Sequence, residues 1–309
     1  MNVFRRIDDL GKIPGPLVLA AGVFDGMHHG HRAVLAAALS AAREMGGTAA
    51  ALTFDPHPSK ILRPDRASRL LTSTPHKLAL MEEFGMQNVL VVPFTQAFAA
   101  IEAEAFLRQL CAAAPALRRV CVGRAWRFGS KRAGDGALLH RLGPELGFET
   151  TEVEPVEIDG AVISSTRIRQ AVEEGDLDAA ERLLGRRYTV AGTVCRGAGL
   201  GRQLGFPTAN LSTHNEQFPP DGVYAVRVHF AGTDLSGVAN IGVRPSVASN
   251  GDRLLEVYLF DFSGDLYDRD LEVKFVAFLR PEKRFPGKEV LQNQIREDAA
   301  HARRILAPE

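Results

Sequence analysis

The sequence predicts two domains of different class: an α/β domain with a parallel, doubly wound sheet, followed by a small antiparallel β-barrel. The chain has 309 residues, which is long for a single hydrophobic core. Its first part alternates apolar strand-like runs with segments of helical periodicity, the pattern of βαβ units. Its last part carries strand-like runs separated by short turns, which is typical of an antiparallel sheet. We place the boundary after Gly185, which gives domains 1–185 and 186–309.

The first domain begins with an apolar run at 17–24, typical of a strand buried on both faces of a parallel sheet. A helical periodicity over 32–45 follows and stops at two glycines. Ligands of such sheets bind at the carboxyl ends of the strands, so we expect a site directly after the first strand. The other expected elements are strands 49–54, 88–94, 120–123 and 150–156, helices 75–84, 97–113 and 137–146, and a helical pair at 163–170 and 177–184.

The second domain shows six strand-like runs and a final helix. Residues 224–228 alternate between inward and outward positions, which predicts a sheet with one wet face that closes as a small barrel. The final helix has one apolar side. The expected strands are 188–195, 208–211, 222–230, 234–241, 254–262 and 271–278, and the helix is 290–306.

The composition excludes several classes of protein. Basic and acidic residues number 37 each and the sequence pI is about 7.1, so the charge does not favour nucleic-acid binding. The 3 cysteines are widely spaced and offer neither a disulfide framework nor a CxxC metal site. No signal-peptide pattern occurs at the start, and no apolar run approaches the ~18 residues of a membrane span. We expect a cytoplasmic protein without a nucleic-acid or membrane partner, and a weak homo-oligomer is left open.

A glycine-rich loop at 197–205 separates two expected strands of the second domain. Glycines allow a tight backbone whose N–H groups turn toward an anion such as phosphate. Thr208 and Asn210 follow on one face of an extended segment, and hard oxygen donors suit a Mg²⁺ ion that also binds nucleotide phosphates. The alternative is an ordinary turn before a strand. No GxxxxGK[ST] motif occurs, so a kinase here is not of the P-loop class.

This loop, together with the run 255–262, closely resembles the riboflavin kinase family. The resemblance implies phosphorylation of riboflavin by ATP, with Glu256 as the base that accepts the proton of the ribityl hydroxyl. It implies Thr208 and Asn210 as the Mg²⁺ positions. The remaining positions that it implies are Gly199, Gly201, Arg202, Gly205 and Pro207 for ATP, and Asn240, in the segment 240–246, and Arg280 for the flavin.

Two of these positions have alternatives. Glu256 is an outward-facing strand acid if Leu255 and Val257 are the buried pair. Arg280 contacts the substrate or forms a salt bridge with Glu282. The sequence does not decide between these interpretations.

Three histidines lie just after the first expected strand, at the start of the next helix. Free N–H groups and the helix dipole favour an anion at that place. His28 and His31 can donate hydrogen bonds to phosphate oxygens, while His29 occupies the variable position between them. Metal binding is the alternative, but no companion ligand follows at a suitable spacing.

Residues 22–31 resemble the HxGH signature of nucleotidylyltransferases, and 163–169 resemble their ISSTxxR. With 53–58 they look like the FMN adenylyltransferase half of bacterial bifunctional riboflavin kinase/FAD synthetases, a Rossmann-like domain before a six-stranded kinase barrel with a C-terminal helix. The resemblance implies His28 and His31 as catalytic residues, and His57 as a flavin contact unless it is a rigid-loop residue. The implied ATP positions are Gly22, Phe24, Asp25, Gly30, Ser164, Ser165, Thr166, Arg167 and Arg169, with either arginine steadying the departing pyrophosphate.

One position departs from the family pattern. Ala125 stands where the family has Asp or Asn, which removes a polar contact to the nucleotide unless Arg124 or Trp126 replaces it. We therefore expect an enzyme that makes FMN and then FAD with ATP and Mg²⁺, with adenylyl transfer weakened roughly ten- to a hundredfold. The alternatives are a kinase with a weakened or re-purposed first domain, adenylylation of another flavin-like phosphate, and a non-catalytic flavin-binding regulator.

Overall fold

A computed structural model describes residues 1–197, 199–243 and 253–307 of the chain. Residues 244–246 of the segment that follows Asn240 therefore lie outside the described part. The chain divides into two compact units. Unit 1 comprises Met1–Leu70 and Thr74–Ser165, and unit 2 comprises Leu71–Ser73 and Thr166–Glu309.

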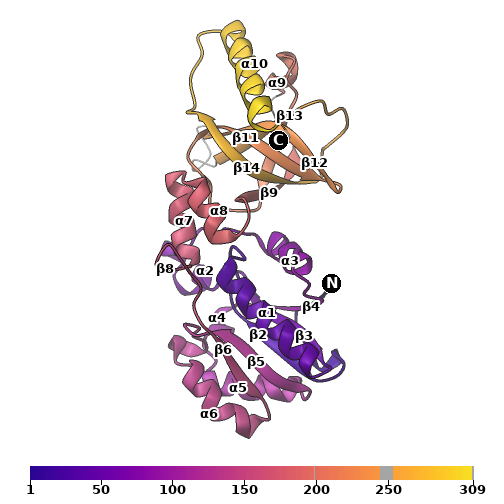
Figure 1. Ribbon diagram of the computed structural model, residues 1–309, viewed down its shortest axis with the longest axis vertical. Coiled ribbons are helices and arrows are strands. Elements are labelled where there is room, and N and C mark those ends of the chain that lie inside the picture. Colours follow the sequence, from indigo (N-terminus) through magenta and orange to yellow (C-terminus); the bar gives the residue numbers. More distant parts are fainter. Residues whose placement is uncertain (198, 244–252, 308–309) are drawn as a thin grey trace. The chain divides into compact units, whose positions relative to one another are not determined.

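Unit 1 contains a six-stranded sheet in which every pair of neighbouring strands is parallel. The strand order is β1-β4-β3-β2-β5-β6, so the chain reverses direction across the sheet on leaving β4 for β5, as in a doubly wound fold. This confirms the predicted parallel α/β domain (Figure 1). The strands are β1 (Asn2–Phe4), β2 (Leu17–Ala21), β3 (Thr48–Asp55), β4 (Asn88–Pro93), β5 (Leu117–Gly123) and β6 (Glu149–Val153).

Helices cover both faces of this sheet because its central strands are apolar on both sides. In β2, Leu17 and Leu19 face a core completed by α5 and α6, while Val18 and Ala20 face a core completed by α1 and α3. Continuous apolar runs of this kind are therefore correct predictors of buried parallel strands here. The helices of unit 1 are α1 (His29–Glu44), α2 (Pro58–Leu62), α3 (Thr74–Glu83), α4 (Gln96–Ala99), α5 (Ala103–Ala113) and α6 (Gly136–Leu146), with short 3-10 turns at Ile7–Lys12, Pro64–Arg66 and Ser130–Arg132.

The single helix expected at 97–113 is wrong, because the structure has α4 and α5 with a break between them. The backbone at Glu102 is extended, with φ −64° and ψ 150°. Ala103 packs against Gly129, where a Cβ would lie 2.6 Å from the Ala103 nitrogen. The Ser130 N–H of the same loop donates to the Ile101 carbonyl at 2.7 Å, so a loop far away in the sequence contacts the break. Strand β1, helix α2 and the hairpin of β7 (Glu157–Ile158) and β8 (Ala161–Val162) were also not predicted.

Unit 2 is built around a closed barrel of six antiparallel strands in the order β10-β13-β12-β11-β14-β9. The six predicted strands are therefore confirmed, with shifts at their ends. The strands are β9 (Thr189–Cys195), β10 (Thr208–Thr213), β11 (Gly222–Phe230), β12 (Thr233–Val243), β13 (Arg253–Leu259) and β14 (Asp270–Arg280). The helices are α7 (Ser165–Glu174), α8 (Leu177–Leu184), α9 (Leu200–Gln203) and α10 (Lys288–Ile305).

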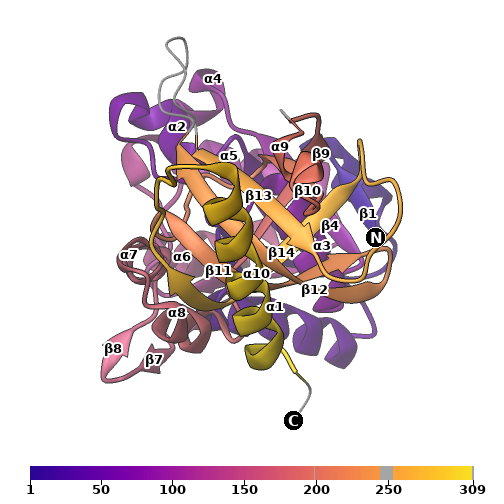
Figure 2. The ribbon, with the colours of Figure 1, turned by 90° about the horizontal axis from the view of Figure 1, so that it is seen from above.

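The final helix, α10, covers one side of the barrel and buries the wall beneath it (Figure 2). The wet face expected for 224–228 is wrong, since residues 222–226 are all buried. On the outer side, Ala225 packs with Ala302 and Leu306 of α10. The sequence pattern gave the barrel strands correctly but not the helix that packs on them.

The segment Leu71–Ser73 is buried and counts with unit 2 although its neighbours in sequence belong to unit 1. Asn215 holds it, because its side-chain amide donates to the carbonyls of Leu71 and Thr189. The same side chain accepts a hydrogen bond from the Ala191 N–H at 3.0 Å.

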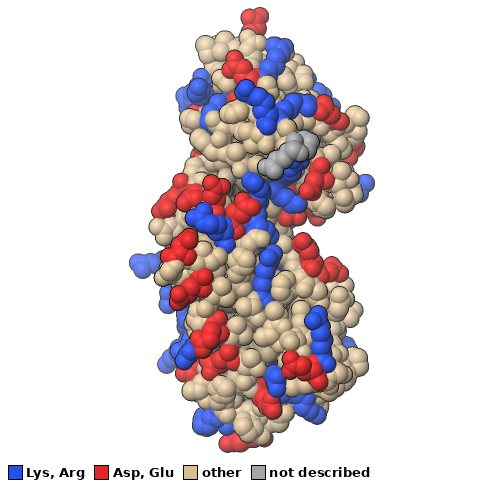
Figure 3. Space-filling model, viewed as in Figure 1, with Lys and Arg blue, Asp and Glu red and all other residues tan. Residues whose placement is uncertain are grey.

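Charge is mixed over the face drawn in Figure 3, where basic and acidic side chains alternate without a single-sign field. This agrees with the equal numbers of basic and acidic residues. Within the described ranges, no helix is both long enough and apolar enough to cross a membrane.

Candidate active sites

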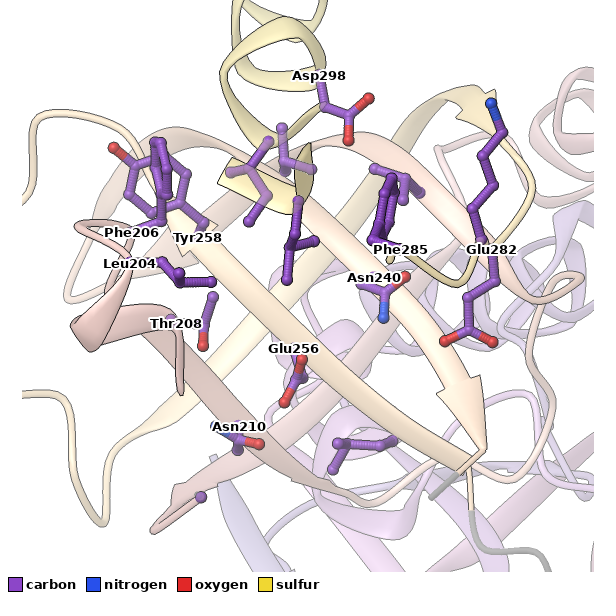
Figure 4. A pocket seen from close by; sticks show the side chains of 18 of the residues that line it. Leu204, Phe206, Thr208, Asn210, Asn240, Glu256, Tyr258, Glu282, Phe285 and Asp298 are labelled. Atoms are coloured by element: carbon purple, nitrogen blue, oxygen red, sulfur yellow. The ribbon is translucent and has the colours of Figure 1, made fainter. Parts of the chain in front are cut away.

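Unit 2 has a pocket of about 680 Å³ between the outer wall of the barrel and α10 (Figure 4). Neighbouring strands β10, β13 and β12 supply its polar wall, and α10 supplies Leu291, Ile295 and Asp298. Of the residues predicted for the kinase site, the pocket brings together Gly199, Gly201, Thr208, Asn210, Asn240, Glu256 and Arg280. Arg202, Gly205 and Pro207 are exposed and do not line it.

The register of the barrel places Glu256 between two carboxamides. Its Cα partner in β10 is Asn210, and its partner in β12 is Asn240. Directly opposite residues of an antiparallel pair lie side by side on the same face. The three side chains therefore form one polar row across three strands.

The two interpretations of Glu256, a base in the site and an outward-facing strand acid, are each correct in part. Leu255 and Val257 are 0% and 1% exposed and fill the barrel interior, as expected for an outward-facing acid at Glu256. The outward direction does not lead to open solvent, however, because this face of the barrel is the pocket wall. Sequence alternation gives the face of a strand, but not what covers that face.

Two glycines of the loop allow it to lie directly on the predicted metal positions. A Cβ at Gly197 would be 2.5 Å from Asn210 Cγ, and a Cβ at Gly201 would be 2.9 Å from Thr208 Oγ1. Such distances exclude a side chain at either position. The loop also contains one helical turn, α9, where the sequence predicted only irregular structure.

The side-chain oxygens of Thr208 and Asn210 suit a Mg²⁺ ion that also binds the phosphates of a nucleotide. Asn210 is 6% exposed, and its Oδ1 has no hydrogen-bond partner among the described residues. A buried carboxamide oxygen without a donor is costly unless it binds a ligand. Within the described part of the chain, no three His, Cys, Asp or Glu side chains form a metal cluster. Mg²⁺ suits such a place, because it commonly takes its other ligands from phosphates and water.

The predicted pair of Arg280 with Glu282 is wrong, and the partner is Asp298 of α10. Arg280 Nε lies 3.0 Å from each Asp298 oxygen, and Nη2 lies 2.8 Å from Oδ2. The Phe285 ring centroid lies 5.6 Å from the guanidinium. Arg280 is thus held at the pocket edge by Asp298, a residue of α10 that lies 18 residues further along the chain.

The candidate site of unit 1 begins at a sharp turn after β2. Phe24 and Met27 have φ values of 55° and 46°, and both side chains are buried. Positive φ is strained for side chains of this size, so the surrounding structure must enforce the turn. Gly22 begins the turn and donates its N–H to Leu52 of β3 at 3.1 Å.

The turn delivers two histidines to the start of α1, with Gly30 between them. His28 is the N-cap, and its Nδ1 accepts the His31 N–H at 3.3 Å. The two rings stack with centroids 3.6 Å apart, and Phe24 packs edge-on against His31. Accepting at Nδ1 leaves Nε2 of His28 as the N–H that can donate to an anion.

Ser165 contacts the same turn, because its Oγ donates to the carbonyl of Asp25 at 2.8 Å. Asp25 is buried, and Ser164 is partly buried beside Ser165. The other residues of this motif, Thr166, Arg167 and Arg169, lie on α7 and belong to unit 2.

His57 lies after β3 at the start of α2. Its Nδ1 accepts the Ser59 N–H at 3.1 Å, so the ring caps this short helix. Ala125 is exposed in the turn after β5, Arg124 pairs with Glu154 at 2.5 Å, and Trp126 stacks on Phe128. Arg124 is therefore already engaged by a carboxylate.

Sequence reasoning missed Lys77, a lysine of α3 that is 5% exposed. Burial lowers its pKa from 10.5 to about 8, although Asp25 and Asp55 favour the charged form. The available signal was its place on the apolar side of the helix, with Leu80 and Met81. A charge at such a position is unusual enough to mark a site.

Comparison with known proteins agrees with both halves of the chain. The family described as FAD synthetase matches residues 11–167, and the family described as riboflavin kinase matches residues 184–306. A bifunctional riboflavin kinase/FMN adenylyltransferase of Pseudomonas fluorescens is 39% identical over 314 residues, covering 100% of this chain and 99% of the relative. Its counterpart in Escherichia coli (strain K12) is 39% identical over 308 residues, covering 99% and 98%.

A solved structure has the same fold over nearly the whole chain. It is described as a macrolide-efflux protein from Streptococcus pneumoniae, with a TM-score of 0.82, 28% sequence identity and coverage of 96% of each chain.

Proposed function

The chain belongs to the bifunctional riboflavin kinase/FMN adenylyltransferase family, and from this premise we propose how its residues divide the two reactions. The protein is an enzyme that phosphorylates riboflavin to FMN and adenylylates FMN to FAD, using ATP in both steps. We assign adenylyl transfer to domain 1–185 and phosphorylation to domain 186–309. A cytoplasmic location and a weak homo-oligomer stay predictions from the sequence.

For the kinase reaction, Glu256 is the base. The ribityl hydroxyl attacks the γ-phosphorus of ATP, its proton passes to the Glu256 carboxylate, and ADP leaves. The observation that carries this assignment is the row of Asn210, Glu256 and Asn240 on one wall of the pocket. Glu256 is the carboxylate in that row.

Mg²⁺ would be held by Thr208 Oγ1 and Asn210 Oδ1, and when bound it would neutralise charge on the ATP phosphates. Gly199 and Gly201 would present backbone N–H groups to the same phosphates. Asn240 and Arg280 would contact the flavin, with Asp298 and Phe285 fixing the guanidinium. Arg202, Gly205 and Pro207 support the fold of the loop in this assignment, because they lie outside the pocket wall.

For adenylyl transfer, a phosphate oxygen of FMN attacks the α-phosphorus of ATP and pyrophosphate leaves. No protein nucleophile is needed, so the residues supply position and charge stabilisation. His28 and His31 donate to phosphate oxygens at the start of α1. Gly22, Phe24, Asp25, Gly30, Ser164 and Ser165 shape the ATP site, His57 borders the flavin, and Thr166, Arg167 and Arg169 complete the family motif on α7.

The test follows products by chromatography after riboflavin, ATP and Mg²⁺ are added to the full chain. We expect FMN first and FAD later. Glu256→Gln should stop FMN formation while FAD still forms from added FMN, and Glu289→Gln, an exposed acid at the start of α10, should change neither. Undiminished FMN formation by Glu256→Gln would refute the assigned base.

A further inference from the structure

One buried ammonium group connects the two loops of unit 1 that carry its predicted site. Lys77 Nζ donates to the Val23 carbonyl at 3.2 Å and, on the next strand, to Thr53 Oγ1 at 3.1 Å and the Phe54 carbonyl at 3.4 Å. Thr53 in turn donates its hydroxyl to Val23 at 2.9 Å. Val23 lies in the turn that ends in the two histidines, and the segment 55–57 starts after Phe54.

From this geometry we propose that Lys77 is a positioning residue for adenylyl transfer, because it fixes the histidine turn after β2 against the end of β3. Lys77 acts through these two loops and is not itself assigned a contact with substrate. The proposal rests on the function proposed for unit 1.

The charged form is the one that fits this place. Three N–H groups of an ammonium match the three acceptors around it, whereas a neutral amine has two N–H groups and a lone pair that would face an oxygen. Asp25 and Asp55 are the charged groups that favour the ammonium, and burial opposes it. The connection should therefore weaken as Lys77 loses its proton.

Packing alone does not explain a lysine here. An apolar side chain of similar length would fill the same side of α3 without a buried charge, and buried charges are retained mainly where they have a specific role. The turn that Lys77 contacts contains two strained residues, Phe24 and Met27, whose conformation needs support from outside the turn.

The first test compares Lys77→Met with a matched control in the full chain. The control is Lys12→Met, because the Lys12 side chain is 73% exposed and pairs with the nearby Asp9. We expect Lys77→Met to lower kcat/KM for FAD formation about ten- to a hundredfold, as for other small displacements of catalytic groups. Riboflavin phosphorylation in the same sample should stay unchanged, and Lys12→Met should preserve both activities.

The second test is the pH profile, which a role in packing alone would not alter. In the wild type, kcat/KM for FAD formation should fall as the pH passes about 8, where Lys77 loses its proton. The Lys77→Gln variant should have a lower kcat/KM for FAD formation than the wild type, and this value should not fall as the pH passes about 8. An unchanged alkaline fall in Lys77→Gln, or wild-type FAD formation by Lys77→Met, would overturn the proposal.

Amide hydrogen exchange separates this proposal from the function on which it rests. In Lys77→Met, peptides covering 23–31 and 53–57 should lose protection while the barrel does not. If the wild type makes FMN but no FAD, the proposed adenylyltransferase has failed, and exchange then decides the positioning role alone. Unchanged protection in both peptides would overturn it.

Discussion

The two candidate sites of this enzyme are built on different principles. In unit 2, side chains that project from neighbouring antiparallel strands form the site, so the ladder register fixes which residues meet. In unit 1, a strained turn at the carboxyl end of β2 forms the site, and its shape depends on contacts made by other segments. In the strand-built site the alternation of each strand decides which side chains face the pocket, while the turn-built site needs support from α3 that the sequence of the turn does not reveal.

The largest expected difference between the two sites is the loss of kinase activity on substitution of Gly197. In Gly197→Ala, the new Cβ would collide with Asn210, which displaces either the loop or a predicted Mg²⁺ ligand. We expect riboflavin phosphorylation to fall about a hundredfold in kcat/KM, with FAD formation from FMN unchanged. Gly287→Ala is the matched control, because a Cβ there meets nothing within 4 Å. Kinase activity equal to the control would show that the loop tolerates displacement.

A smaller loss is expected from Asn210→Ala, which removes the buried oxygen that has no hydrogen-bond partner within the described ranges. The Mg²⁺ concentration for half-maximal phosphorylation should rise about tenfold, the loss of roughly 1.4 kcal/mol of binding free energy. The measurement is a Mg²⁺ titration of both activities in one preparation. A shift in the FAD-forming reaction instead would contradict the placement of the metal in unit 2.

Ala125→Asn tests unit 1 by a gain of activity. The substitution restores the polar side chain that the family pattern has in the turn after β5, where the present residue is exposed. We expect kcat/KM for FAD formation to rise about tenfold, the worth of one hydrogen bond at the transition state. An unchanged value would mean that Trp126 or another group already replaces the missing contact.

The smallest expected effect is that of Lys77→Met on the free energy of unfolding. This measurement separates a positioning role of Lys77 from a role in packing. The pKa of Lys77 falls from 10.5 to about 8 on folding, so between these pH values the unfolded chain binds more protons and stability rises with pH. Below pH 8 the charge opposes folding by roughly 3 kcal/mol. Lys77→Met should remove that cost but leave the Phe54 carbonyl without its donor, which costs about 1 to 2 kcal/mol.

The free energy of unfolding of Lys77→Met should consequently be equal to or slightly above that of the wild type at pH 7, measured by thermal melting of the full chain. The control is Lys12→Met. A fall of the melting temperature by many degrees would indicate that Lys77 chiefly holds the fold together.

The parts that sequence analysis predicted are those that depend on local pattern. Alternation and apolar runs gave the parallel sheet and all six barrel strands, and spacing placed Thr208 and Asn210 on one wall. The break between α4 and α5 was missed, and the start of α5 packs against Gly129, which lies far along the chain. Asp298 was missed as the partner of Arg280 for the same reason, since it belongs to α10.

Lys77 was missed for a different reason. Its helix was predicted correctly, at 75–84 against Thr74–Glu83, and its place on the apolar side of that helix was a usable signal, but the sequence does not say what its ammonium contacts. Only the three-dimensional arrangement shows that its Nζ reaches two strand ends. In both sites, the supporting residues that were missed belong to another element, Asp298 to α10 and Lys77 to α3.

The central claim, that one chain holds two separable sites, is tested most directly by complementation. Glu256→Gln and His31→Asn variants of the full chain are each given riboflavin, ATP and Mg²⁺, and then mixed. We predict no FMN from Glu256→Gln, FMN without FAD from His31→Asn, and FAD from the mixture at a rate set by released FMN. Loss of FMN formation in His31→Asn, no FAD from added FMN in Glu256→Gln, or no FAD from the mixture would contradict the account.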